Sequence, residues 1–569
     1  MKPQQKLLNS VDCCVDEALE GIVSSSGCLS LLRGHRVVVR ADLEALKGRV
    51  ALLSGGGSGH EPAHAGYIGS GMLSAAVAGG VFASPPPASV LAAILSLRDA
   101  GVSGVLLVVK NYTGDRLNFG LAAEQARNRG VAVEMVIVAD DCAFDQPSKA
   151  GRRGLCGTVF VHKLAGALAE EGCPLDEIVS KVTEAVKGIG TLGVSLSPCS
   201  VPGCLPSFQL PAGEMELGLG ERGRESWDWG REGELGLGER GRGRENHMTN
   251  PASQSHLSLK SGDSVVLCVN NLGALSCLEM AVVTRSAIHY LEGRGVRVAR
   301  VMSGSFMTSL EMAGVSLSMM RADQEILRLF DAKTTAPAWP NLSTVCISGR
   351  SYILDPPAKD MQETSHTEGP LSDVMRKALE AVCSSLLQRQ EELNSLDRAS
   401  GDGDCGNTHA QAAKAIQEWL QSHIVPGCPG QLLSTLAGLV QERMGGSSGA
   451  LYSLFLTAAA ALLKDGGDPA AWANAMQAGT DAMRWCLDAL CPAVEELRRL
   501  TTSPPGGHMA ILQAAVEKAE LGAESTRDLT ARAGRASYIA TVRVTLPDPG
   551  AVAIAAILRA VFEALGGQK

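Results

Sequence analysis

Short apolar runs rich in β-branched residues alternate with longer Ala- and Leu-rich segments over the first 340 residues. Segments such as 88–100 and 117–130 have the composition of helices. The runs between them predict buried strands: RVALLS (49–54), GVLLVVK (104–110), AVEMVIVAD (132–140) and SVVLCVNN (264–271). This alternation predicts an α/β domain with a mostly parallel sheet that is covered on both faces. Ligands of such sheets bind at the carboxyl ends of the strands.

The pattern changes after residue 370, where the strand signals end. Residues 372–396 carry apolar side chains at helical spacing, and further helical segments follow at about 431–443, 450–464, 468–490, 508–522 and 550–565. The C-terminal part is therefore expected to be an all-helical bundle or barrel. Residues 341–370 have neither pattern and are rich in Pro and polar residues, which is typical of an interdomain linker.

Length, charge and cysteine use narrow the class of protein. A chain of 569 residues is too long for one core, so at least two domains are expected. A net charge of −9 gives no electrostatic indication of a nucleic-acid partner, and none is expected. The nearly apolar run 450–463 is too short to span a bilayer and predicts a buried helix. The start of the chain shows no export signal and the 16 Cys have no paired CxxC spacing, so we expect reduced thiols, no zinc site and a cytoplasmic location, in the cytosol.

A glycine-rich segment, SGGGSGHEPAHAG (54–66), directly follows the first predicted strand. Its glycines allow a tight backbone path and close approach of a ligand. The spacing is not GxGxxG and lacks the Lys-Ser/Thr of a P-loop, so a nucleotide site is weakly indicated and a plain turn stays open. His60 and His64 in the same segment favour acid–base chemistry.

The segment KNYTGDRLNFG (110–120) follows the strand GVLLVV. It places Lys110, Asp115 and Arg116 at a strand's carboxyl end. Charged side chains at a strand end often only contact solvent. Two polar segments at the strand ends of one sheet nevertheless favour a shared site.

Three carboxylates crowd into LDRASGDGDCGNTH (396–409), namely Asp397, Asp402 and Asp404. Hard divalent cations bind several oxygen ligands, and Mg²⁺ combines carboxylates with substrate phosphates. The register does not fit an EF-hand. We therefore expect a metal site in this Gly-broken loop, with a solvated acidic turn as the alternative.

MGGSSGALY (444–452) precedes the buried helix and offers backbone N–H groups with the hydroxyls of Ser447 and Ser448. Such a helix start suits a phosphate, or is a plain N-cap. GRASYIA (534–540) and PDPGAVA (547–553) by themselves indicate only a turn and a helix start.

Taken in order, these motifs and GRRGLCGTVFVHK (151–163) closely resemble the dihydroxyacetone kinase family. The resemblance implies an α/β kinase-substrate domain of two α/β subdomains at 9–340, a linker at 341–370, and an eight-helix barrel for the nucleotide at 371–569. It implies phosphorylation of dihydroxyacetone and glyceraldehyde by ATP with Mg²⁺, in a homodimer. Bifunctional members also cleave FAD to AMP and cyclic FMN, with Mg²⁺, Mn²⁺ or Co²⁺.

The resemblance also implies roles for individual residues. The acid/base candidates are His60 and Asp115, and the metal ligands are Asp397, Asp402 and Asp404. The triose would be bound by Gly57, Ser58, Gly59, His60, Lys110 and Asp115. The nucleotide would be bound by Asp402, Gly403, Asp404, Cys405, Ser447, Ser448, Asp548, Gly550, Ala551 and Val552.

The sequence departs from the family in two segments. A near-repeat, ELGLGERGRE (216–225) and ELGLGERGRGRE (234–245), fills an aberrant region at 214–246, where Arg222 stands in place of the His that binds the triose covalently in this family. Guanidinium stays protonated at neutral pH and has no free lone pair for a hemiaminal. Near 484–487 the chain also lacks the Gly-Asp-Arg-Thr loop that helps to close over the nucleotide.

These departures leave alternatives open beside the bifunctional enzyme. FAD cleavage needs no covalent triose, so the chain could be an FAD-AMP lyase only. It could also be a non-catalytic homologue. The abrupt change of composition at 214–246 also fits an alternative or erroneous segment.

Overall fold

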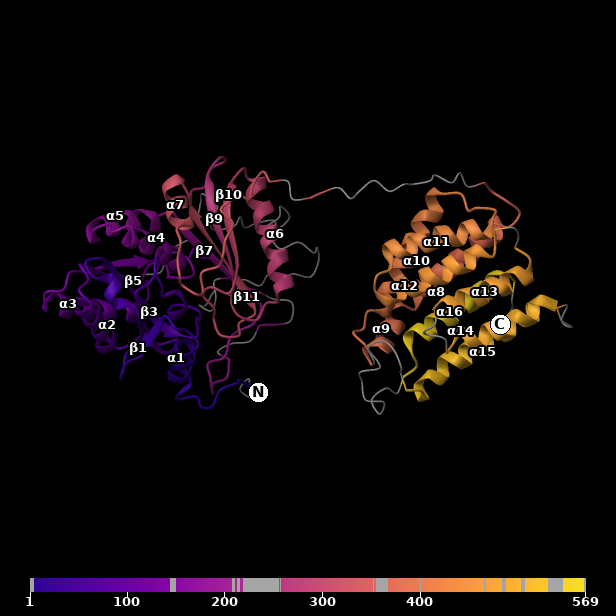
Figure 1. Ribbon diagram of the computed structural model, residues 1–569, viewed down its shortest axis with the longest axis horizontal. Coiled ribbons are helices and arrows are strands. Elements are labelled where there is room, and N and C mark those ends of the chain that lie inside the picture. The colour runs from indigo at the N-terminus through magenta and orange to yellow at the C-terminus, as the bar shows by residue number, and fades with distance from the viewer. Residues whose placement is uncertain are drawn as a thin grey trace. The chain divides into compact units, whose positions relative to one another are not determined.

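The computed structural model describes residues 5–143, 150–206, 210–211, 215–217, 255, 257–350, 353–354, 367–399, 401–464, 467–483, 488–502, 507–530 and 546–566. The chain forms two compact units, Met1–Asp355 and Pro356–Lys569 (Figure 1). The boundary falls inside the segment predicted to be a linker. The first residues of that segment are nevertheless ordered against the N-terminal unit, because the amides of Ile347 and Ser348 both donate to Val298 O at 3.1 Å.

The first sheet of the N-terminal unit has six strands in the order β1-β2-β4-β3-β5-β6. These are β1 Leu29–Leu31, β2 Val37–Arg40, β3 Val50–Ser58, β4 Ala75–Val81, β5 Gly104–Lys110 and β6 Val133–Val138. The four strands β4, β3, β5 and β6 are parallel, whereas β1 and β2 are antiparallel at the edge. The predicted strands at 49–54, 104–110 and 132–140 are confirmed.

The second sheet is mixed, in the order β10-β9-β11-β7-β8. Its strands are β7 Ile189–Ser195, β8 Glu216–Leu217, β9 Ser264–Asn271, β10 Arg297–Gly304 and β11 Gly314–Arg321. The predicted strand 264–271 is β9, but only β10 runs parallel to it, and β11 is antiparallel to both β9 and β7. The expectation of a mostly parallel sheet is therefore wrong here. The chain passes from β10 to β11 without a crossover helix, and such a connection favours antiparallel return.

Seven α-helices of the described N-terminal residues cover these sheets: α1 Cys14–Ser24, α2 Pro87–Asp99, α3 Thr113–Arg127, α4 Thr158–Glu170, α5 Leu175–Val186, α6 Cys277–Gly293 and α7 Gln324–Asp331. Helices α2 and α3 pack on one face of the first sheet. On its other face lie α4 and α5, in a core shared with the second sheet and α7. Helix α6 covers the far face of the second sheet. The strand ends thus belong to a rigid, layered scaffold.

The described C-terminal unit is helical: α8 Ser372–Gln388, α9 Gln390–Arg398, α10 Cys405–Ser422, α11 Pro429–Arg443, α12 Gly446–Ala461, α13 Pro469–Met483, α14 Leu490–Leu497, α15 Gly507–Ser525 and α16 Pro549–Ala564. Each helix from α10 to α16 contacts the next, and α8 contacts both α16 and α10, which closes a ring of eight helices. The interior is filled by small and medium apolar side chains such as Ala413, Ala519 and Ala553. The expected eight-helix barrel is confirmed.

Three details of the helical prediction change. The expected helix 372–396 is two helices, α8 and α9, that meet at Arg389. The buried helix expected at 450–463 begins earlier, at Gly446. Helices α10 and α14 were not predicted; four of the nine buried residues of α10 are alanines, which give a weak periodic signal.

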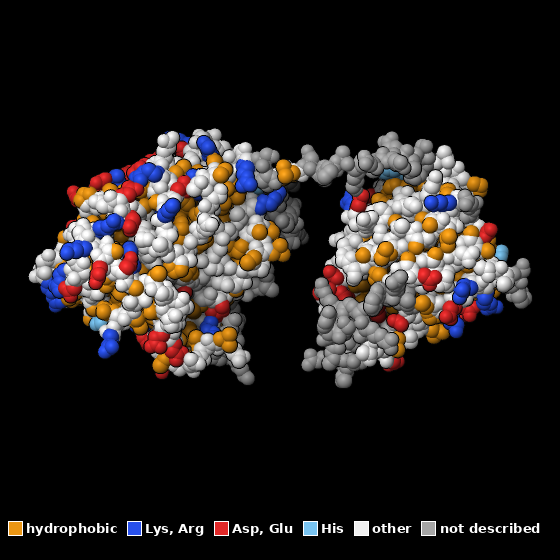
Figure 2. Space-filling view, in the orientation of Figure 1, with side chains coloured by type: hydrophobic (Ala, Val, Ile, Leu, Met, Phe, Trp, Pro, Cys, Tyr) orange, Lys and Arg blue, Asp and Glu red, His pale blue; other side chains and the backbone are white. Residues whose placement is uncertain are grey.

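Neither unit shows a transmembrane helix in its described residues, since none is both long and apolar enough to cross a bilayer. On the face shown in Figure 2, Lys and Arg side chains are interspersed with Asp and Glu. That face of the described residues presents no extended basic surface of the kind nucleic acids bind.

Candidate functional site

The glycine-rich segment begins as strand, because residues 54–58 belong to β3. Gly55 and Gly56 continue β3 and pair with Val77 and Ala78 of β4. A Cβ atom at Gly55 would lie 2.2 Å from the carbonyl oxygen of Val77, so only glycine allows this close approach of the two strands. The turn begins at Gly59, whose φ of +98° is in the left-handed region. The expected loop is therefore shorter than the sequence indicates.

Lys110 and Asp115 meet beside this glycine strand, as the sequence predicted. Lys110 is the last residue of β5, Asp115 lies in the first turn of α3, and both side chains are only 3% exposed. A Cβ atom at Gly56 would lie 3.4 Å from Lys110 Nζ and 3.6 Å from Asp115 Oδ2. Burial raises the pKa of Asp115, whereas Ser84 and Lys110 lower it. Burial lowers the pKa of Lys110, and the charges of Asp115 and Asp140 act against this.

His60 is held in one orientation by the second subdomain. Its Nδ1 donates to the carbonyl oxygen of Thr308 at 2.7 Å, so Nε2 carries the free lone pair. The amides of Thr308 and Leu310 donate to the carbonyls of His60 and Gly59, respectively. Burial, with a contribution from Lys110, lowers the pKa of His60 to about 3. The imidazole is therefore neutral at physiological pH and can accept a proton only transiently.

Two residues near this site were not singled out by the sequence. Ser84 hydrogen-bonds the Asp115 side chain, and its Oγ would lie 2.7 Å from a Cβ atom at Gly114. Glu61 accepts the amide of Gly59 at 2.9 Å. Glu61 was visible inside the motif, but Ser84 lies in the Pro-rich turn after β4 and had no signal of its own.

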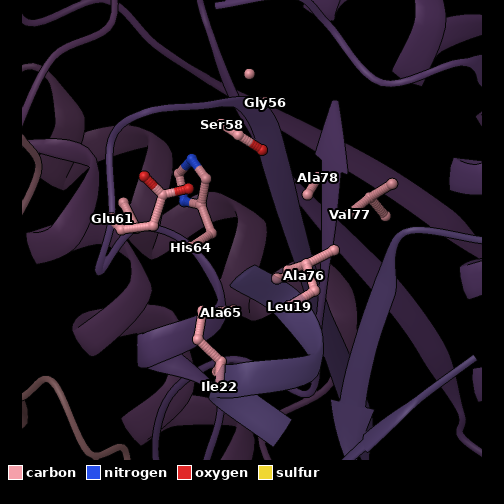
Figure 3. A pocket seen from close by; sticks show the side chains of 12 residues that line it. Leu19, Ile22, Gly56, Ser58, Glu61, His64, Ala65, Ala76, Val77 and Ala78 are labelled. Atoms are coloured by element: carbon pink, nitrogen blue, oxygen red, sulfur yellow. The ribbon is translucent and has the colours of Figure 1, made fainter. Parts of the chain in front are cut away.

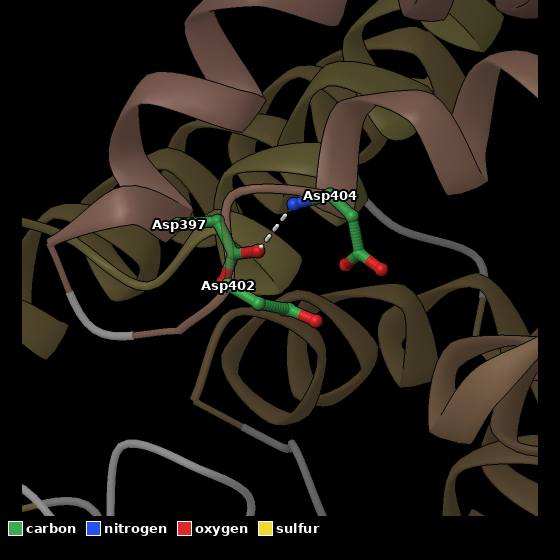
Figure 4. A group of neighbouring side chains, drawn as sticks. All are labelled: Asp397, Asp402 and Asp404. Carbon is green, nitrogen blue, oxygen red and sulfur yellow. Dashed lines mark hydrogen bonds between the residues drawn. The ribbon is translucent and has the colours of Figure 1, made fainter. Parts of the chain in front are cut away.

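The aspartates predicted to bind a metal come together in the C-terminal unit (Figure 4). One carboxylate oxygen from each of Asp397, Asp402 and Asp404 can be chosen so that all lie within 4.8 Å of one another. Asp397 ends α9 and is half-buried, and the other two are exposed. This set of closely spaced carboxylates fits a hard divalent ion such as Mg²⁺.

Backbone amides fix this aspartate loop. Oδ2 of Asp397 accepts the N–H groups of Gly403, Asp404 and Cys405 at 3.0, 2.9 and 3.2 Å. Gly403 has a φ of +81°, which turns the chain into the start of α10. Burial, together with the charge of Asp397, raises the pKa of the Cys405 thiol to about 12, so this thiol stays protonated at neutral pH.

A polar link joins the start of α10 to the start of α12. His409 Nδ1 donates to the Cys405 carbonyl at 2.8 Å, and its Nε2 lies 3.2 Å from the hydroxyl of Tyr452. Ser447 and Ser448 lie in the first turn of α12, one to two turns before Tyr452. The predicted phosphate segment is thus connected through α10 to the aspartate loop.

Asp548 caps α16. Its Oδ2 accepts the amide of Ala551 at 2.7 Å, and Gly550 lies in the same first turn. Burial raises the pKa of Asp548, and the charges of Asp488 and Asp397 add to this, so the three carboxylates lie in one electrostatic neighbourhood. The side chains of Ala551 and Val552 pack in the barrel core. Only backbone groups of these two residues remain for a ligand.

Three sequence features lie outside the described residues. These are Arg222 within the aberrant segment, the departure at 484–487, and the GRASYIA motif. Their predicted effects therefore stay predictions.

Comparison with known proteins assigns the family. The Dak1 domain matches residues 20–338 and the DAK2 domain matches residues 399–563. The chain belongs to the dihydroxyacetone kinase family. It is 53% identical to proteins named Triokinase/FMN cyclase from Rattus norvegicus and Homo sapiens. Each alignment covers 99% of this chain and 99% of the relative. These names support the predicted enzyme class, a kinase and cyclising lyase.

Solved structures of the family agree with the predicted fold class. The native dihydroxyacetone kinase of C. freundii covers 98% of this chain and 99% of its own, with 34% identity and a TM-score of 0.61. The same enzyme in complex with AMP-PNP and Mg²⁺ matches with 33% identity and a TM-score of 0.60. The α/β unit followed by a helical unit is therefore the family architecture.

Proposed function

We propose that this protein phosphorylates dihydroxyacetone and glyceraldehyde with ATP, and cleaves FAD to AMP and cyclic FMN. The observation that carries the proposal is the cluster of Asp397, Asp402 and Asp404 within 4.8 Å, which lies at the start of the part of the chain that matches the DAK2 domain, residues 399–563. Both reactions act on a phosphate chain that needs charge neutralisation. Phosphoryl transfer depends mostly on positioning and on cations.

In the proposed kinase reaction the N-terminal unit holds the triose. Lys110 and Asp115 bind its hydroxyls beside the backbone of Gly57, Ser58 and Gly59. Nε2 of His60, or the carboxylate of Asp115, accepts the proton of the attacking hydroxyl. The free Nε2 lone pair of the neutral His60 ring and the raised pKa of the buried Asp115 support these roles, because each group offers an acceptor for the proton as the hydroxyl attacks.

The C-terminal unit holds the nucleotide in this proposal. Asp397, Asp402 and Asp404 bind Mg²⁺, and Ser447, Ser448 and the start of α16 contact the nucleotide. A bound Mg²⁺ would stabilise the negative charge that develops on the phosphates, and Mn²⁺ or Co²⁺ would serve FAD cleavage. The protein works as a homodimer in which the ATP unit of one chain serves the triose site of the other.

An FAD-AMP lyase without kinase activity is the second candidate. Arg222 favours it, since guanidinium cannot form the covalent adduct with the triose. A missing loop at 484–487 would weaken ATP binding in addition. A non-catalytic homologue is the third candidate, and the intact aspartate cluster argues against it.

One pair of assays separates these candidates. The purified chain is incubated with Mg²⁺, ATP and dihydroxyacetone, and separately with FAD and Mn²⁺. Formation of both products supports the bifunctional enzyme, and formation of cyclic FMN alone supports the lyase. If neither product forms, the proposal is overturned. Transcript sequencing across 214–246 decides whether that segment belongs to the main product.

A further inference from the structure

A pair of buried histidines lies behind the glycine strand and has no part in the mechanism described above. His64 Nδ1 lies 3.0 Å from His162 Nε2 and 3.4 Å from Ser54 Oγ. His64 is 7% exposed and His162 is fully buried. Among the described residues, His64 Nε2 and His162 Nδ1 have no hydrogen-bond partner. Since buried polar atoms are rarely left unpaired, a ligand or an ordered water is expected at such an atom.

The neighbours of His64 decide which nitrogen carries the proton. The Ser54 hydroxyl donates to the carbonyl oxygen of Val108 at 2.7 Å, so its oxygen can only accept from His64. We therefore assign His64 Nδ1 as the donor, toward both Ser54 Oγ and His162 Nε2. The lone pair of His64 Nε2 is left to accept a hydrogen bond from another molecule.

His64 lines a small cavity with Gly56, Gly57, Ser58 and Glu61. In Figure 3, Glu61 and His64 lie across from Val77 and Ala78, with Ser58 above them and Ala65 and Ile22 below. The apolar lining includes Leu19 and Ile22 of α1, Ala76 and Ala78 of β4, and Ala65 of the short turn that follows His64. The space enclosed here is about 20 Å³, which admits a single hydroxyl group or water beside His64.

Strand register places this histidine on the same face as the proposed triose ligands. Ser54 of β3 pairs with Val108 of β5. Two residues farther along each strand, Gly56 and Lys110 return to the same face, because side chains alternate along a strand. Burial, the His162 ring and the Lys110 charge keep the pKa of His64 well below its usual value. The ring is therefore neutral, and Nε2 retains its lone pair.

We propose that His64, oriented by His162, is a positioning residue of the triose site whose Nε2 accepts a hydrogen bond from a hydroxyl of dihydroxyacetone. This inference rests on the proposed function, since it takes the triose as the ligand. With Arg222 in place of the covalent His, binding depends on hydrogen bonds alone, which makes each of them more important. If the two histidines were only a packing pair, their replacement would change stability and leave triose binding as it is.

The test measures the affinity of the full-length chain for dihydroxyacetone by titration calorimetry, which needs no turnover. His64→Leu keeps a similar volume without a polar atom and is expected to weaken binding about 3- to 10-fold, the loss of one neutral hydrogen bond. His64→Gln places an amide near the position of Nε2 and should restore most of the affinity. His162→Leu releases the ring orientation and should weaken binding by a smaller factor.

Ser74→Ala is the matched control. Its hydroxyl is buried directly before β4 and accepts the amide of Leu52 at 3.1 Å, but Ser74 does not line the cavity. Thermal unfolding of all four variants reports whether each is folded. In the kinase assay, KM for dihydroxyacetone should rise in His64→Leu with little change in kcat.

The outcomes separate this inference from the proposed function. A folded His64→Leu variant with wild-type affinity overturns the inference, even if phosphorylation is observed. Equal losses in His64→Leu and Ser74→Ala also overturn it. If the wild-type chain binds dihydroxyacetone through His64 but forms no phosphorylated product, the inference stands and the kinase reaction does not. Absence of binding to the wild-type chain overturns both.

Discussion

Oδ2 of Asp397, at the end of α9, accepts the backbone amide of Asp404 at 2.9 Å. This hydrogen bond joins the two ends of the loop that carries the aspartate cluster. The same oxygen accepts the amides of Gly403 and Cys405, so part of the charge of Asp397 is offset by the backbone at the start of α10. The fold thereby tolerates three close carboxylates before any cation is added.

Asp402→Ala is expected to abolish both kinase and FAD-cleaving activity, because in the proposed function one metal site serves both reactions. A metal contributes several kcal/mol to the stability of a transition state, so the loss should be on the order of a hundredfold or more. Titration calorimetry should show weakened Mg²⁺ uptake. Glu418→Ala, on the exposed side of α10 and more than three turns away, should change neither activity. Retained FAD cleavage in Asp402→Ala would refute the shared site.

Arg222 is expected to leave the triose without a covalent bond. Dihydroxyacetone labelled with ¹³C at its carbonyl should bind without producing the resonance of a tetrahedral carbon, since guanidinium offers no lone pair. The wild-type C. freundii enzyme serves as a comparison in the same NMR experiment. A tetrahedral signal that belongs to the bound triose in this chain would contradict the role assigned to Arg222.

Acid should destabilise the N-terminal unit through its buried histidines. The pKa of His162 is lowered to about 3 by burial and by Lys110, and burial also lowers the pKa of His60 to about 3. Below a pH of about 6.5 the unfolded chain binds protons that the folded chain does not, so stability present above that pH is lost as the pH falls. Each such histidine lowers the free energy of unfolding by about 1.4 kcal/mol for each pH unit below that point.

Scanning calorimetry between pH 6.5 and 5 checks this slope. The melting temperature of the wild-type chain should fall more steeply with acid than that of His162→Leu, which lacks one titrating group. Parallel slopes for the two proteins would mean that His162 is protonated in the folded state.

Gly55→Ala is expected to destabilise the N-terminal unit by about 1–3 kcal/mol, the usual effect of overpacking. The new Cβ atom would lie 2.2 Å from the carbonyl oxygen of Val77 and would push β3 away from β4. Gly120→Ala is the control, since a Cβ atom at this position in α3 has no neighbour within 4 Å. That substitution should stabilise the protein by up to about 1 kcal/mol. Denaturant unfolding of both variants measures the difference, and equal stability would argue against the strand contact.

Features set by neighbours in sequence were readable from the sequence. Buried strands at 104–110 and 264–271 follow from runs of β-branched residues, and the aspartate cluster follows from three carboxylates within eight positions. In each case the interacting groups are close along the chain, so their spacing alone limits what they can form. Prediction from local pattern also explains why α10 was missed: its alanines give only a weak periodic signal.

Contacts between distant residues were decided only by the tertiary structure. His60 is oriented by Thr308, 248 positions away, and His64 meets His162 across 98 positions. No local pattern encodes such pairs, because they form only when the layers of sheet and helix have packed. The sequence by itself determined many of the strands and helices, the family and the aspartate loop. The packing of the two subdomains decided which histidine nitrogens face the site, since hydrogen bonds from remote backbone and side chains fix the orientation of each ring.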